Sequence, residues 1–424
     1  NTELPSELDE RVLFAFKALF KKSQHPQSYT HQLMSFYQAC RDFRLLQVIP
    51  DIVVGRTPQQ VYIVLKNLQS NLLVELRDEA TADEIIARIK TLEDNAESGI
   101  DRRALDLLGS MVERKSSELL NQPGPHVDAA VAALRRAFDR EWADGEQRQM
   151  ADYLQALGKI TQPKLADEQM RQLKELHRQA TPGTDDRLFI AFSLASGHFN
   201  SYDRRDEGLA VMENAIREFN QTHSDGWPLH ASVPLSGYVS FMEQVSRFSQ
   251  AEKLLDGYLK NPLNPTAKNW FLKRQNQVFH AALKGKGRVS LGEGDVLYKA
   301  LVERIIGHAR ESDPSYQYAF LSDLIGVYRT ANNLHLPTVS SDIREFALKQ
   351  LPPLLESQTH QYRTLVTQFG QTLRDIAGAR FGLEFLMDRV DTWPRRMRNS
   401  WEDAWSQCGN NMGRWWQETS GKAA

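Results

Sequence analysis

The chain has 424 residues, of which 41% are hydrophobic and 25% are charged, and its formal net charge is −2. This composition is ordinary for a folded soluble protein, and the near-neutral charge excludes a global field that would draw in nucleic acid or an anionic membrane. No run approaches the ~18 apolar residues that a membrane helix needs. We therefore expect a soluble protein, either cytoplasmic or exported to the periplasm or beyond, with no nucleic-acid partner and no membrane insertion.

Helical periodicity dominates from the N-terminus onward. Apolar residues recur every three to four positions over residues 8–20, 104–120 and 128–142, the pattern of one buried helical face. Thr81 and Glu84 have the spacing of a capping box at the start of another helix. Strand patterns are scarce, so we predict an all-α fold.

The segments between the predicted helices are short. Residues 48–55 are rich in β-branched residues but contain Pro50, and they are predicted to be a linker between helices, with a short strand as the alternative. Elsewhere Asp313-Pro314 predicts a helix start. The remaining connections are turn-like: residues 121–125, 181–184, 261–265 and 285–294.

These short connections predict one continuous helical body, or two helical lobes that meet near residue 181. We divide the chain into an N-terminal helical region, residues 1–180, and a repeat domain, residues 181–424, whose C-terminal helix is rich in tryptophan.

The most informative segment runs from Arg363 to Pro394. Its two halves carry apolar or small residues at helical spacing, with Gly370 and Gly382 where the halves would touch and a proline at the end. This pattern resembles a tetratricopeptide-type repeat, in which two helices meet at small residues and a proline follows.

Two further segments resemble the same repeat less closely. Residues 189–215 carry a small residue at Gly208, and residues 232–258 carry one at Ala251. These two positions are further apart than the family period of about 34 residues. Tyr258 stands where the family prefers alanine, and residues 1–180 show no such register.

The resemblance implies helical hairpins stacked into an α-solenoid that binds a protein or an extended peptide. In the family, the first helix of each repeat lines the concave groove with polar residues. Carried onto the matching positions of this sequence, the groove would be lined by Ser193, Asn200, Ser240, Glu243, Gln244, Thr367, Gln371, Arg374 and Asp375. These side chains are mostly uncharged, which suits an extended peptide bound through hydrogen bonds.

The C-terminal segment is unusual because it holds five of the eight tryptophans, interleaved with arginines. Trp401 and Trp405 share one helical face and are predicted to cap the last repeat. Trp415 and Trp416 are adjacent and cannot both face one core, so they are candidate interface residues. The alternatives for such a surface are a protein partner and the stacking of bases or sugars.

Nothing in the sequence predicts a catalytic or metal site. Cys40 and Cys408 cannot form a disulfide framework or a four-cysteine zinc site, and no two of the eleven histidines have the spacing of a helical zinc motif. Residues 285–294 are glycine-rich but lack the order of a phosphate-binding loop. We therefore expect no catalytic residue, no metal and no cofactor.

The sequence favours a non-catalytic helical repeat scaffold. Two alternatives remain open: an α/α-toroid enzyme that acts on polysaccharide through carboxylates on its loops, and a structural module of a larger exported protein. A further domain after Ala424 is compatible with each of these hypotheses.

Overall fold

A computed structural model of the chain describes most of its central part. The described residues are 49–69, 79–119, 124–157, 162–201, 204–224, 231–260, 265–285, 291–312 and 314–336, together with a few isolated positions. The predicted repeat at residues 363–394 and the tryptophan-rich segment lie outside this part of the chain. So do Thr367, Gln371, Arg374, Asp375, Trp415 and Trp416.

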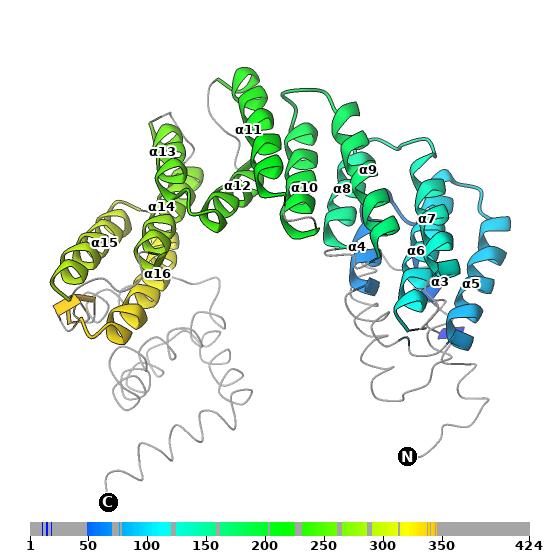
Figure 1. Ribbon diagram of the computed structural model, residues 1–424, viewed down its shortest axis with the longest axis horizontal. Helices are drawn as coiled ribbons and strands as arrows, with labels where there is room; N and C mark the ends of the chain where they lie inside the picture. Colours follow the sequence, from blue (N-terminus) through cyan, green and yellow to red (C-terminus); the bar gives the residue numbers. More distant parts are fainter. Residues whose placement is uncertain are drawn as a thin grey trace, which may run out of the picture. The chain divides into compact units, whose positions relative to one another are not determined.

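Every regular element among the described residues is a helix, and none of these residues lies in a β-strand. The all-α prediction is confirmed for this part of the chain (Figure 1). The helices are α3 (Ile49–Val53), α4 (Pro58–Asn67), α5 (Glu79–Asp94), α6 (Gly99–Leu119), α7 (Gly124–Phe138), α8 (Glu146–Ala156), α9 (Pro163–Gln179), α10 (Asp185–Ser201), α11 (Arg205–Thr222), α12 (Ser232–Gln244), α13 (Phe248–Leu259), α14 (Pro265–Gly285), α15 (Leu291–Glu311) and α16 (Pro314–Asn333).

The helices form two compact units. Unit 1 ends at Ser224 and also takes in Val233–Phe241, and unit 2 contains residues 225–232 and those from Met242 onward. In unit 1, α10 packs on both α8 and α9, so helix contacts cross the predicted boundary at residue 181. The division into a helical region without the repeat register and a repeat domain stays a prediction.

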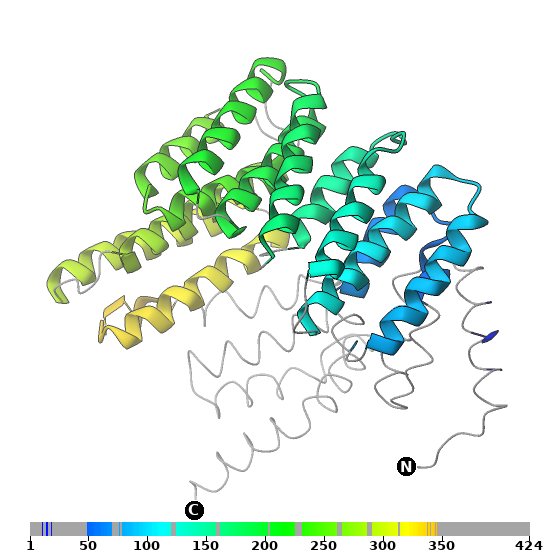
Figure 2. The ribbon, with the colours of Figure 1, turned by 45° about the vertical axis from the view of Figure 1, so that its right-hand side comes forward.

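Helices that follow one another in the chain pack as pairs within each unit. In unit 1 the most extensive helix contacts are those of α6 with α7 and of α10 with α11. Helices that are two apart in the chain also pack on each other: α7 contacts α9, and α8 contacts α10. In unit 2, α13 packs on α14 and α15 on α16, and α14 also touches α16. Figures 1 and 2 show the α6–α7 and α10–α11 pairs side by side from two directions.

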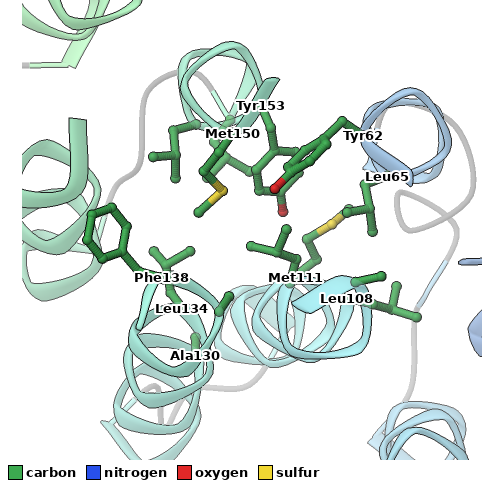
Figure 3. Packing of buried hydrophobic residues seen from close by; sticks show 14 of the residues in the cluster. Tyr62, Leu65, Leu108, Met111, Ala130, Leu134, Phe138, Met150 and Tyr153 are labelled. Carbon is green, nitrogen blue, oxygen red and sulfur yellow. The ribbon is translucent and has the colours of Figure 1, made fainter. Parts of the chain in front are cut away.

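The core of unit 1 lies where α4, α6, α7 and α8 meet, and Figure 3 shows its side chains pointing toward one another. Tyr62 of α4 and Tyr153 of α8 are both buried, with ring centroids 6.0 Å apart. The surrounding side chains in that view are Leu65, Leu108, Met111, Ala130, Leu134, Phe138 and Met150. They come from the apolar stripes that the 3.6-residue periodicity predicts.

A buried ion pair crosses this core. Arg103 of α6 and Glu146 of α8 are each only 1% exposed, and an Nη1 hydrogen of Arg103 is donated to the Glu146 carboxylate. The hydroxyl of Tyr62 donates to the same carboxylate at 3.2 Å. The guanidinium also lies 4.1 Å from the centre of the Trp142 ring. One pair of charges therefore joins three helices and the α7–α8 connection.

Three further hydrogen bonds from Arg103 hold the end of α7 and the α7–α8 connection. Its Nε donates to the carbonyl of Ala137 at 2.7 Å, and its Nη2 donates to the carbonyls of Arg140 at 2.7 Å and Glu141 at 2.9 Å. The last carbonyls of a helix have no partner within the helix itself. Arg103 supplies such a partner to Ala137 from a neighbouring helix, and its bonds to Arg140 and Glu141 hold the chain that leaves α7.

The prediction of a linker at residues 48–55 is wrong, because this segment contains the helix α3. Ile49, Ile52 and Val53 are fully buried, and the Asp51 carboxylate pairs with Arg88 of α5 at 2.6 Å. Pro50 is the second residue of α3, where a missing N–H costs nothing. Tertiary burial, which local composition does not reveal, decides the conformation here.

The predicted capping box at Thr81 is also wrong, because α5 begins at Glu79 and Thr81 lies buried inside it. A capping box does occur at α4: the Gln60 N–H donates to the Thr57 hydroxyl, and the Thr57 N–H donates to the Gln60 side chain. Pro58 occupies the first position of that helix, as the geometry favours.

Three predicted connections are shorter than expected, and two further predictions are confirmed. Helix α7 begins at Gly124, inside the predicted turn 121–125. Helix α14 begins at Pro265, the last residue of the predicted turn 261–265, and α15 begins at Leu291, inside the predicted loop 285–294. The predicted helix start at Pro314 is confirmed, as is the turn 181–184 between α9 and α10.

Gly208 holds α10 and α11 close together, as its place in the predicted helix pair requires. A Cβ at this position would lie 2.7 Å from Cδ2 of Phe199 and 3.1 Å from the carbonyl oxygen of Ala195. The phenyl ring is buried and the carbonyl belongs to the backbone of α10, so neither can retreat freely. The two helices can approach this closely only where the side chain is a hydrogen atom.

We therefore expect Gly208→Ala to destabilise unit 1 by roughly 1–3 kcal/mol, because the added methyl forces α10 and α11 apart. Gly257→Ala is the matched control: Gly257 is exposed in α13 with no atom near its Cβ position, so the change should stabilise by up to about 1 kcal/mol. Urea unfolding of the full chain measures both. Equal stability of Gly208→Ala and the parent would contradict this view of the helix contact.

Candidate functional site

The structure describes five of the predicted groove residues and places them in different environments. Ser193 is buried in α10, and its hydroxyl donates to the Phe189 carbonyl at 3.2 Å. Asn200, in the last turn of α10, is exposed. In α12, Ser240 is half-buried and Gln244 is exposed. Asn200 and Gln244 are therefore the most accessible of these side chains.

The fifth residue, Glu243, is half-buried and belongs to a chain of polar contacts in unit 2. Its carboxylate accepts a hydrogen bond from Nη2 of Arg274 at 2.6 Å. Arg274 also donates to the Gln277 side chain at 3.4 Å, and Gln277 donates to Asp323 at 3.2 Å. We call Glu243, Arg274, Gln277 and Asp323 the polar seam; it joins α12, α14 and α16.

Asp323 is the unusual member of the polar seam. Its Oδ2 is buried and has no hydrogen-bond partner. Burial raises the pKa of this carboxyl to about 6, although Lys273, the Gln277 hydrogen bond and Arg274 act in the opposite direction. The neutral acid is therefore favoured in the folded chain over a wider pH range than in water.

A second polar feature is a pocket of about 280 Å³ in unit 1, which we call the α9–α11 pocket. It lies among α9, the C-terminal end of α10 and the N-terminal end of α11. Its lining residues are Asp167, Met170, Arg171, Lys174, His198 and Arg204. A Cβ at Gly197 would come within 2.8 Å of the Met170 sulfur, so glycine at this position lets α9 and α10 approach beside the pocket.

His198 is the buried titratable residue of this lining. Only 2% of the residue is exposed, and its Nδ1 has no hydrogen-bond partner. The nearest carboxylate, that of Glu207, lies 3.5 Å from Nδ1 without hydrogen-bond geometry. Burial lowers the pKa of His198, and Lys174 and Arg204 lower it further while Glu207 opposes them. The neutral form of the imidazole is therefore favoured in the folded chain.

The charged residues of the pocket differ in how they are engaged. Arg171 donates to the buried Glu168 carboxylate at 2.6 Å. Arg204 lies within 3.9 Å of Glu207. Lys174 is exposed and forms no ion pair within the part of the chain that the structure describes. The pocket therefore offers one cation that is not committed elsewhere.

Sequence reasoning did not find this pocket. His198 is one of the eleven histidines that share no metal-site spacing, and nothing in the sequence distinguishes it from the others. The available signal was the spacing of Asp167, Arg171 and Lys174, which places three charges on one face of α9. Only the packing of α10 and α11 shows which buried side chain that face meets.

The described residues contain no group of three or more His, Cys, Asp or Glu side chains that could hold a metal ion. No helix in this part of the chain is both long enough and apolar enough to cross a membrane. No protein-family model matches the sequence, and no curated protein matches it either.

The polar seam predicts a pH-dependent stability. The pKa of Asp323 in the folded chain, about 6, exceeds the ordinary value of 3.8. The protonated form therefore contributes stability that is fully present below pH 3.8 and is lost as the pH rises through 6. We expect Asp323→Asn to be more stable than the parent at pH 7.5, by up to about 3 kcal/mol, and close to it at pH 4.

Urea unfolding of the two proteins across this pH range checks the expectation. Asp186→Asn, which replaces an exposed carboxylate on α10, is the control and should leave the difference between pH 4 and pH 7.5 unchanged. A parent and an Asp323→Asn variant with parallel pH profiles would show that the carboxyl is not held in an unfavourable environment.

Proposed function

We propose that the chain is a non-catalytic helical repeat scaffold, with helical hairpins stacked as an α-solenoid, that binds a protein or an extended peptide. The observation that supports this proposal most directly is the order of the helix contacts. Helices adjacent in the chain pair, and pairs are joined through helices two apart, α7 to α9 and α8 to α10. Repeat arrays have this property, because each unit buries its apolar face only on its neighbours.

The accessible side chains support a peptide as the ligand. Asn200 and Gln244 are exposed, uncharged and able to both donate and accept hydrogen bonds. An extended peptide presents unpaired backbone N–H and C=O groups, which such amides can bind without selecting a strongly charged sequence. Thr367 and Gln371 belong to the same proposed groove by their sequence positions.

Selection of a random displayed peptide library on the full chain tests this function. Enriched peptides are resynthesised, and their affinities are measured by fluorescence anisotropy. Asn200→Ala should weaken binding roughly two- to tenfold, the range expected for one lost hydrogen bond. Gln221→Ala, which removes an exposed amide from the other helix of the same pair, is the matched control. Failure to enrich any binding peptide, or equal losses for the two variants, would contradict the proposal.

A further inference from the structure

The α9–α11 pocket is not among the predicted groove positions, and its lining has a chemistry of its own. Three cationic side chains line it, Arg171, Lys174 and Arg204, together with the carboxylate of Asp167. The Glu207 carboxylate lies 3.5 Å from Nδ1 of His198 and pairs with Arg204. The charge of Arg171 is largely neutralised by Glu168. Lys174 is the cation that remains available, and its charge favours a ligand that carries negative charge.

His198 gives a second and independent reason to expect a ligand. A buried ring nitrogen without a hydrogen-bond partner is costly, and native structures rarely leave one. A neutral imidazole with its proton on Nδ1 presents a donor there. An oxyanion in the pocket would accept that hydrogen bond and remove the cost, whereas an apolar ligand would leave the nitrogen unpaired.

The volume of the pocket and its apolar wall limit which ligands can bind. A volume of about 280 Å³ is at the lower end for small-molecule sites, so it suits a single side chain or a small anion. Met170 is 94% buried and contributes an apolar wall between the charged groups. A ligand with a short apolar stem and a charged end would match both parts of this lining.

We propose that the α9–α11 pocket binds an oxyanion group, a carboxylate or a phosphate, through the charge of Lys174 and a hydrogen bond from Nδ1 of His198. The group has two sources. One is an acidic side chain of a bound peptide, which rests on the proposed function; the other is a free small anion, which does not.

The test is a nuclear magnetic resonance titration of the full chain with ¹³C-labelled histidine, at constant ionic strength. The probes are inorganic phosphate, the capped dipeptide Ac-Glu-Glu-NH₂ and its uncharged counterpart Ac-Gln-Gln-NH₂. We expect phosphate to shift the His198 ring signal in a saturable way, and the uncharged dipeptide to leave it unmoved. A shift by Ac-Glu-Glu-NH₂ identifies peptide carboxylates as a source, and its absence beside a phosphate shift identifies the free anion.

The variant Lys174→Gln tests the assignment without disturbing the core, because Lys174 is exposed. It should weaken phosphate binding about tenfold, as the loss of a charge-assisted hydrogen bond predicts. Lys164→Gln is the matched control: Lys164 lies on the same helix, pairs with Asp128 at 2.9 Å and is not part of the pocket lining.

Two results would overturn the proposal: a His198 signal that neither anion moves, or equal weakening by the two lysine variants. Neither depends on the peptide selection, because phosphate binding is read directly from His198. A failed selection together with a Lys174-dependent phosphate shift would remove the scaffold function and leave the oxyanion site.

Discussion

A guanidinium removed from water needs hydrogen-bond acceptors and a counter-charge, and unit 1 is organised around the way Arg103 meets this demand. Isolated buried charges cost several kcal/mol, so such a group persists only with excellent pairing. Glu146 provides the charge, and three backbone carbonyls, one in the last turn of α7 and two in the α7–α8 connection, provide further acceptors. The pairing sets the end of α7 and the start of α8 together, because Glu146 is the first residue of α8.

The position of α8 has consequences further along the chain. Met150 and Tyr153, on the buried face of α8, complete the core between α4 and α6 (Figure 3). The same helix contacts α9 and α10. These are two of the three helices that form the α9–α11 pocket, so the helix that begins at Glu146 lies against the helices that line it. Gly208 then sets the approach of α11, whose first turn carries Glu207 beside His198.

The sequence was most informative where a local pattern decides the structure. The amphipathic stripe of residues 104–120 corresponds to α6, and that of residues 128–142 overlaps α7, which ends earlier, at Phe138. The small residue Gly208 lies at a helix contact as predicted. Prediction failed where distant partners decide. Asp51 is buried in a helix because Arg88 pairs with it, and Arg103 is buried because Glu146 lies opposite, 43 positions away in the chain. Neither partner can be identified from composition or periodicity, and the same holds for the surroundings of His198.

A double-mutant cycle on Arg103 and Glu146 tests most directly whether the buried pair organises unit 1. Arg103→Met, Glu146→Leu and the double variant are compared by the hydrogen-exchange free energies of amides in α6, α7 and α8. Each single change should lower these free energies by about 3–5 kcal/mol, because it leaves an uncompensated buried charge. The double variant should lose clearly less than the sum, since it leaves none. Additive losses would contradict the account, because they would mean that the two charges do not depend on each other.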